Sequence, residues 1–115
     1  MYQVWISTHF AKQLKPLVKK YRHLKEDIIK ALDKFDKRQN QALGNDTYKL
    51  RLKSTDVPRG KSKSFRMILY IAEVDKILVP VAVYFKGERE DISQREINYH
   101  LAMVLIELES KKHSN

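Results

Sequence analysis

Residues 47–53 read Thr-Tyr-Lys-Leu-Arg-Leu-Lys, and residues 65–85 read Phe-Arg-Met-Ile-Leu-Tyr-Ile-Ala-Glu-Val-Asp-Lys-Ile-Leu-Val-Pro-Val-Ala-Val-Tyr-Phe. In the first stretch the tyrosine and leucine side chains alternate strictly with basic ones, which predicts a half-buried strand with one apolar and one basic face. The second stretch contains two runs of β-formers, residues 65–73 and 77–85, which we expect to pair as a hairpin. Both runs are apolar on alternate faces as well, so this part of the sheet should be covered on more than one side or closed against a terminal helix.

Two helical stripes precede these strands. After a short first strand around Val4, Ser7 or Thr8 is a suitable N-cap for a helix, although Pro16 should kink or shorten that helix. The apolar positions of the first stripe are Phe10, Leu14, Leu17, Val18 and Tyr21, and those of the second are Leu24, Ile28, Ala31, Leu32 and Phe35. Because so few residues separate the stripes, we expect a helical hairpin, followed by a polar loop over residues 38–46.

A capping-box pattern, Ser93 to Glu96, predicts the start of a C-terminal helix, with the Ser hydroxyl bound to the Glu96 N–H and the Glu carboxylate reaching back to the Ser93 N–H. The core stripe of this helix is Ile97, Leu101, Val104, Leu105 and Leu108. Residues 101–106 are apolar around more than a full turn, and the surplus is either wrapped by the rest of the domain or lies in a partner groove.

These elements predict one α+β domain over residues 1–110, in the order β-α-α-β-β-β-α, with a polar tail at residues 111–115. Its antiparallel sheet of about four strands should carry the helical hairpin and the C-terminal helix.

The composition favours an intracellular protein that binds polyanions. The chain has 115 residues, 23 Lys and Arg against 14 Asp and Glu, and a net charge of +9, which attracts nucleic acids. The absence of cysteine excludes disulfides and thiolate metal sites and fits a reducing compartment, so we expect a cytoplasmic protein. Residues 1–10 show no signal-peptide pattern, and the longest apolar stretch is well short of the roughly 20 residues that span a bilayer.

The chain resembles the RelE/ParE superfamily of bacterial type II toxins, on its RelE/HigB side. Three motifs carry the resemblance, in the expected order: Tyr-Lys-Leu-Arg-Leu at 48–52, Arg-Gly-Lys-Ser-Lys-Ser-Phe-Arg-Met-Ile-Leu-Tyr at 59–70, and Val-Tyr-Phe-Lys-Gly-Glu-Arg-Glu-Asp-Ile-Ser at 83–93. The resemblance implies a toxin that cleaves mRNA in the ribosomal A site and so inhibits translation, with rRNA and mRNA as partners and an acidic antitoxin as inhibitor. The ParE branch instead poisons DNA gyrase, and a degenerate, non-catalytic basic binding protein is a further alternative, so function has to be argued from the site.

Arg66 is the best single candidate for a catalytic residue. RNA is cleaved without a metal when its 2′-OH attacks the adjacent phosphate in line, and a protein assists by moving protons and neutralising the developing charge. A guanidinium is permanently charged and can hold two phosphate oxygens at once. Alternation places Arg66 opposite Phe65 and Met67, on a face where it must reach solvent, a carboxylate or a ligand; a structural salt bridge is the competing interpretation.

Lys86, Glu88 and Arg89 follow the last strand and are expected to meet Arg66 at the rim of the sheet. In the resemblance, Lys86 and Arg89 occupy positions of basic residues that stabilise the transition state. The sequence departs from the pattern at Gly87, where several members carry a further arginine. It departs again where a catalytic Tyr or His often follows, because this chain has Ser93, the expected helix cap.

The proton handlers could be Glu88, Lys86 or Tyr84. Tyr84 could also stack on a base, or simply be a half-buried strand aromatic.

Basic residues gather in the middle of the chain, where Asp56 is the single acid. The proposed RNA-binding residues are Lys49, Arg51, Lys53, Arg59, Lys61 and Lys63. They would contact phosphates without reading sequence, and an ordinary solvated strand face is the alternative. The histidines show no metal-like spacing, so we assign no metal, and the sequence indicates no cofactor.

Overall fold

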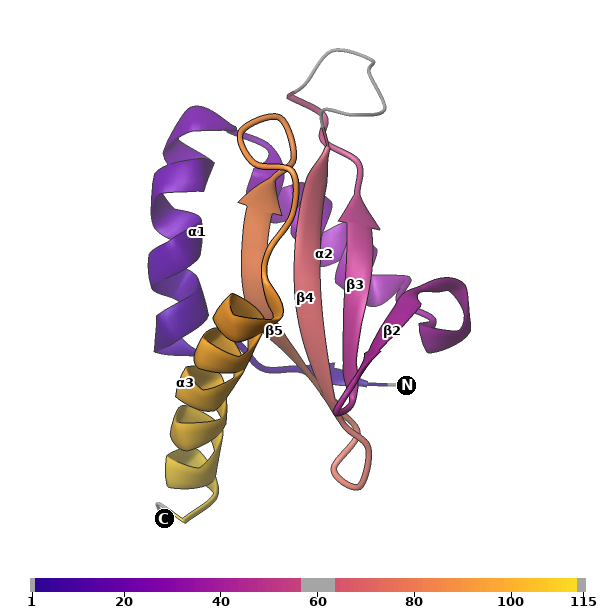
Figure 1. Ribbon diagram of the computed structural model, residues 1–115, viewed down its shortest axis with the longest axis vertical. Coiled ribbons are helices and arrows are strands. Elements are labelled where there is room, and N and C mark those ends of the chain that lie inside the picture. The colour runs from indigo at the N-terminus through magenta and orange to yellow at the C-terminus, as the bar shows by residue number, and fades with distance from the viewer. Residues whose placement is uncertain (1, 57–63, 114–115) are drawn as a thin grey trace.

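The strands predicted from the alternation form the inner part of a sheet whose order is β1-β5-β4-β3-β2 (Figure 1). In the computed structural model, which describes residues 2–56 and 64–113, β3, β4 and β5 are antiparallel neighbours and β1 joins β5 in parallel. The elements are β1 (Gln3–Val4), α1 (Thr8–Lys20), α2 (Leu24–Asp33), the 3₁₀ helix η1 (Lys37–Gln39), β2 (Gln41–Gly44), β3 (Thr47–Leu52), β4 (Phe65–Ala72), β5 (Ile77–Phe85) and α3 (Gln94–His113). The predicted α+β class is confirmed.

The two faces of the sheet carry separate apolar cores, as the alternation in both hairpin strands predicts. One face packs against α1 and α2, and its buried side chains from the sheet are Leu50, Leu52, Phe65, Met67, Leu69, Ile71, Leu78 and Val83. The opposite face packs against α3 and includes Ile68, Val79, Val81, Ala82 and Tyr84. Figure 1 shows α2 behind the sheet and α3 in front of it.

Both N-terminal helices form where their apolar stripes predict. The Ser7 hydroxyl accepts a hydrogen bond from the Phe10 N–H at 2.9 Å and so caps α1. Pro16 lies inside α1 without ending it, so the expected shortening does not occur. Glu26 and Asp27 lie in the first turn of α2, where the helix dipole favours negative charge.

The expected polar loop over residues 38–46 was wrong, because the segment contains η1 and the edge strand β2. A tight turn joins β2 to β3, with positive φ at Gly44 (90°), Asn45 (54°) and Asp46 (60°). These residue types adopt such angles readily, so the chain reverses and adds one strand to the expected four.

Helix α3 continues through Lys111 to His113, so these residues are helical rather than part of a tail. Basic residues in the last turn suit the helix dipole, and the Lys112 ammonium lies 2.7 Å from the Asp75 carboxylate. At the other side of the helix, Glu107 accepts from the backbone N–H groups of Thr8 (2.7 Å) and His9 (2.9 Å). Glu107 therefore fastens α3 to the N-terminus of α1.

Candidate nucleic-acid interface

A row of three polar side chains crosses the face of the sheet that α3 covers in part. Arg66 on β4 lies opposite Tyr84 on β5 and opposite Arg51 on β3. Directly opposed residues in antiparallel strands have Cβ atoms about 4.5–5.5 Å apart. The register therefore brings together Arg66, Arg51 and Tyr84, which lie on three separate strands.

The Arg66 guanidinium is held by local hydrogen bonds rather than by a carboxylate. Its Nη1 donates to the hydroxyl of Ser64 and, at 3.4 Å, to the carbonyl oxygen of Phe65. Among residues 2–56 and 64–113 no acidic group forms an ion pair with Arg66, so the competing salt-bridge interpretation finds no partner there. A half-buried guanidinium that is oriented but not neutralised is available to an anionic ligand.

Asp91, which the sequence analysis did not select, organises the neighbourhood of Tyr84. Its Oδ1 accepts from the Lys49 ammonium (2.9 Å), from the Tyr84 hydroxyl (3.1 Å) and from the Ile92 N–H (2.8 Å). The Lys49 hydrogen bond, followed by the one from the Ile92 backbone, lowers the pKa of Asp91 to about 2. Lys49 is therefore partly neutralised, which reduces its expected role in phosphate binding.

Tyr84 belongs to the core more than to the surface. Tyr84 is 5% exposed, so its ring cannot stack on an RNA base in this arrangement. The interpretation of Tyr84 as a strand aromatic fits this burial. Burial raises the pKa of the Tyr84 hydroxyl, which stays protonated at neutral pH. A protonated phenol that donates to Asp91 is not a general base.

Arg89 lies beside Tyr84, with its guanidinium carbon 5.7 Å from the ring centroid. Its Nη2 and Nη1 donate to the two carboxylate oxygens of Glu96 at 2.6 and 3.0 Å, and its Nε donates to the Asp91 carbonyl at 3.0 Å. The Ser93 half of the capping box is confirmed, because its hydroxyl accepts from the Glu96 N–H at 3.1 Å. The carboxylate half was wrong, since Glu96 binds Arg89 rather than the Ser93 N–H.

Glu88 does not join Arg66. Its carboxylate pairs with the Lys20 ammonium at the end of α1, at 3.1 Å, and both side chains are more than half exposed. Glu88 and Arg89 line a depression of about 450 Å³ between α1 and β5, together with Tyr84 and His100. The expected cluster is therefore divided, with Glu88 turned toward α1.

His100 is a second residue near the site, after Asp91, to which the sequence analysis assigned no role. Its Nδ1 lies 2.7 Å from Nε2 of His9, and burial, followed by the charge of His9, lowers the pKa of His100. A His four residues after an acid on a helix is a weak pattern, so nothing in the sequence distinguished it.

Lys86 lies at the same end of the sheet as Arg66. Its backbone N–H donates to the Ser64 carbonyl at 2.9 Å, next to the residue whose hydroxyl accepts from Arg66. Lys53 follows directly after β3. Of the remaining predicted RNA-binding residues, Arg51 is exposed, whereas Arg59, Lys61 and Lys63 lie outside the described residues. We call Arg51, Arg66, Lys86 and Arg89 the cationic face.

Within residues 2–56 and 64–113, no group of three or more His, Asp or Glu side chains could hold a metal ion. His23 instead binds Asp56 at 2.7 Å, and its pKa is raised by that hydrogen bond. None of the helices in the described part of the chain is long and apolar enough to span a membrane.

No protein-family profile matches the chain, and no curated protein matches its sequence. Solved structures do match it. The isolated E. coli RelE toxin aligns with TM-score 0.52 and 17% identity, covering 92% of this chain and 99% of that one. A free-state E. coli RelE variant with two arginines changed to alanine aligns with TM-score 0.52 and 16% identity over 77% of this chain and 87% of that one.

The intact E. coli RelBE toxin–antitoxin complex also matches, with TM-score 0.50 and 18% identity over 72% of this chain and 94% of the matched chain. The chain has a RelE-like fold. At such low identity the likeness concerns the fold, and the RelE-like scaffold leaves the chemistry to be argued from side chains.

Proposed function

We propose that this protein is the toxin of a type II toxin–antitoxin pair and that it cleaves mRNA on the ribosome. The observation that carries the proposal is Arg66, a guanidinium oriented by Ser64 on a RelE-like sheet and without an acidic partner among the described residues. A permanent cation at this position would stabilise the phosphorane as negative charge develops on its oxygens.

The reaction needs no group beyond the RNA and the protein. The 2′-oxygen loses its proton and forms a bond to phosphorus, the bond from phosphorus to the 5′-oxygen breaks, and that oxygen takes up a proton. The products are a 2′,3′-cyclic phosphate and a 5′-hydroxyl. Arg66 and Arg89 would supply positive charge, although Arg89 must share its guanidinium with Glu96.

Lys86 fits the role of proton handler best among the three predicted candidates. Glu88 is occupied by Lys20, and Tyr84 is a protonated donor to Asp91. By contrast, Lys86 has no ion pair with any described residue and lies at the Arg66 end of the sheet. Exchange for arginine, which keeps the charge but holds its proton, should lower the cleavage rate and change its pH profile.

The decisive experiment is cleavage of a defined mRNA on purified ribosomes, read by primer extension. Arg66→Ala should slow cutting by about a hundred- to thousandfold, since removal of one donor to a developing oxyanion typically has this effect. Arg38→Ala is the matched control, because that arginine lies on η1, is not one of the four residues of the cationic face, and pairs with Asp36. Undiminished cutting by Arg66→Ala would exclude this residue from the mechanism. Equal cutting of mRNA without ribosomes would show that the ribosome is not required.

A gyrase-directed activity is the second candidate, favoured by one observation. Ser93, where the resemblance expects a catalytic Tyr or His, is engaged as the cap of α3. Expression in growing bacteria separates the candidates: mRNA cuts within translated frames support RNA cleavage, whereas DNA breaks with intact mRNA support gyrase poisoning. Unaffected growth with a folded protein would contradict both.

A further inference from the structure

Two histidines, one on α1 and one on α3, share a short contact outside the cationic face. Nε2 of His9, in the first turn of α1, lies 2.7 Å from Nδ1 of His100, in the second turn of α3. Their ring centroids are 5.0 Å apart. The backbone N–H of His9 also donates to Glu107 of α3, so the position of this pair is fixed from both helices.

One ring nitrogen of His100 is left for a ligand. Nδ1 contacts His9, whereas Nε2 forms no hydrogen bond with any described residue. Among the described side chains no nitrogen or oxygen atom is both buried and without a partner, so Nε2 of this half-buried ring is open to solvent. When the ring proton is on Nδ1 and is donated to His9, Nε2 carries a lone pair and can accept a proton.

His100 faces a depression that suits a nucleotide. It lines the hollow of about 450 Å³ between α1 and β5, whose walls are mostly apolar side chains of these two elements. Ligand sites are typically apolar hollows in which a few polar groups fix the orientation of the ligand. Arg89 is on the same lining and lies over the ring of Tyr84, the partner of Arg66 in the sheet. The depression therefore adjoins the cationic face.

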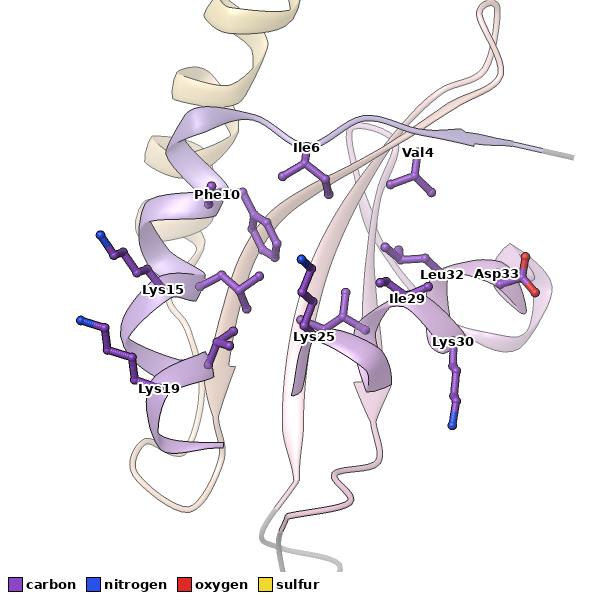
Figure 2. A pocket seen from close by; sticks show the side chains of 14 residues that line it. Val4, Ile6, Phe10, Lys15, Lys19, Lys25, Ile29, Lys30, Leu32 and Asp33 are labelled. Atoms are coloured by element: carbon purple, nitrogen blue, oxygen red, sulfur yellow. The ribbon is translucent and has the colours of Figure 1, made fainter. Parts of the chain in front are cut away.

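A larger hollow of about 790 Å³, between α1 and α2, lacks this combination of groups. Its lining consists of apolar side chains, lysines and one acid, Asp33 (Figure 2). Lys15 and Lys19 project outward from α1, and Asp33 lies far from the Phe10 end. A lysine ammonium is a donor without a lone pair, so it accepts no proton. Of these two hollows, the one beside His100 combines a proton acceptor with a guanidinium for phosphate.

We propose that His100 is the general base of the RNA cleavage, that His9 positions it, and that the depression binds the ribose on the 5′ side of the cut. The assignment rests on the proposed function and adds a residue to it. Nε2 of His100 takes the proton of the 2′-OH while the 2′-oxygen forms its bond to phosphorus. The bond from phosphorus to the 5′-oxygen breaks, and that oxygen takes a proton from a second group, a role that suits Lys86. His100 then releases its proton to solvent, so α3 supplies the acceptor that is missing at Ser93.

The surroundings of His100 favour its neutral form. The titratable and charged groups around its ring and the depression are His9 from α1, Tyr84 from β5, Glu88 and Arg89 from the loop after β5, and Glu96 and Tyr99 from α3. Burial, followed by the charge of His9, lowers the pKa of His100; Glu96 acts in the opposite direction but is paired with Arg89. A base acts when it is unprotonated, so cleavage should rise with pH to a plateau, with a midpoint below about 6.5, the ordinary value for histidine.

The first measurement is the pH dependence of kcat and KM for cleavage of a defined mRNA on ribosomes. His100→Gln should lower kcat by about a hundred- to ten-thousandfold, leave KM nearly unchanged and abolish the rise with pH. His9→Gln should lower kcat less and move the midpoint to higher pH, because the charge that depresses the pKa of His100 is lost. His113→Gln is the matched control, since that exposed histidine at the end of α3 pairs with Glu109; it should behave like the parent.

The second measurement uses the unmodified chain, so it does not depend on the folding of a variant. The four nucleoside 3′-monophosphates carry a 2′-OH beside a phosphate, and each is titrated into the protein while the histidine ring signals are followed by NMR. Binding should move the signals of His100 and raise the pH at which they titrate, because the phosphate is an anion. The ring of His113 and the amide of Ile29, which lines the larger hollow, should not respond.

The outcomes separate this inference from the proposed function. An active parent with an equally active His100→Gln, or with the same pH profile in that variant, would overturn the role of His100 and leave RNA cleavage in place. A merely structural pair would lower the stability of both variants, measured by thermal unfolding, and leave the pH profile unchanged. Nucleotide binding at His100 in a chain that cuts no mRNA would overturn the cleavage proposal and retain the nucleotide site. Ring signals that no nucleotide moves would overturn the site.

Discussion

Phe65 and Arg66 are neighbours in the chain, yet they belong to faces of the sheet that are built differently. Toward α1 and α2 the face is apolar along β4, where Phe65, Met67 and Ile71 are fully buried. Toward α3 the face is apolar where the helix covers it and becomes cationic beyond that cover. The difference shows that the reach of a covering helix, rather than the strand alone, decides which side chains are buried in the core and which are left accessible.

Phe65→Ala should produce the largest change in stability. Loss of a fully buried phenylalanine that contacts the rings of Tyr21 and Phe85 should lower the free energy of unfolding by about 3–5 kcal/mol. Arg66→Ala should leave that free energy nearly unchanged while it reduces activity. Guanidinium chloride unfolding of both variants makes the comparison, and similar losses would contradict the division between the faces.

Glu107→Ala tests whether the cover of the second face depends on its link to α1. The carboxylate satisfies two N–H groups at the start of α1, and loss of a helix cap typically lowers stability by roughly 1 kcal/mol. Hydrogen exchange should also accelerate in α3. Glu109→Ala is the control, because that exposed side chain pairs with His113 on its own helix; an equal effect would refute a capping role.

Asp91→Asn should have the smallest effect and an identifiable pH dependence. Because the folded-state pKa of Asp91 is depressed to about 2, its contribution is present above the unfolded pKa near 4 and is lost as pH falls toward 2. The side chain is 64% exposed, so solvent screening limits the contribution to less than about 1 kcal/mol. Chemical denaturation should show that the difference in free energy of unfolding between variant and parent is smaller at pH 2 than at pH 7. A difference that does not change with pH would contradict this account.

Periodicity predicts most of the fold because burial on a strand or helix face repeats at a fixed interval. Both helices of the hairpin, β3, β4 and β5 follow from it. β2 could not be predicted, since Gln41 to Gly44 is short, lies at the sheet edge and depends on the turn at Asn45. Residues 111–113 of the expected tail are helical, and Lys112 there pairs with Asp75, a contact distant in sequence that composition does not indicate.

The same contrast between regular and irregular segments applies to the candidate site. Alternation separates Arg66 from Phe65 and Arg51 from the leucines beside it, and the register pairs Arg66 with both Arg51 and Tyr84. The loop after β5 has no period, so its hydrogen bonds decide that Glu88 turns toward Lys20 and that Asp91 turns toward Lys49. In such a loop the residue types indicate which chemical groups are present, but they do not predict where the side chains point.

The hydrogen bonds between Glu107 and the start of α1 can form only late in synthesis, because the two segments are far apart in the sequence. Residues 8 and 107 leave the ribosome about 5–20 s apart at about 5–20 residues per second, so α1 emerges long before its carboxylate cap is made. Until then the two N–H groups are exposed to water and the α3 face of the sheet has no cover. The cationic face therefore acquires its final surroundings only when synthesis has passed the last helix, and a nascent chain is not yet the finished molecule.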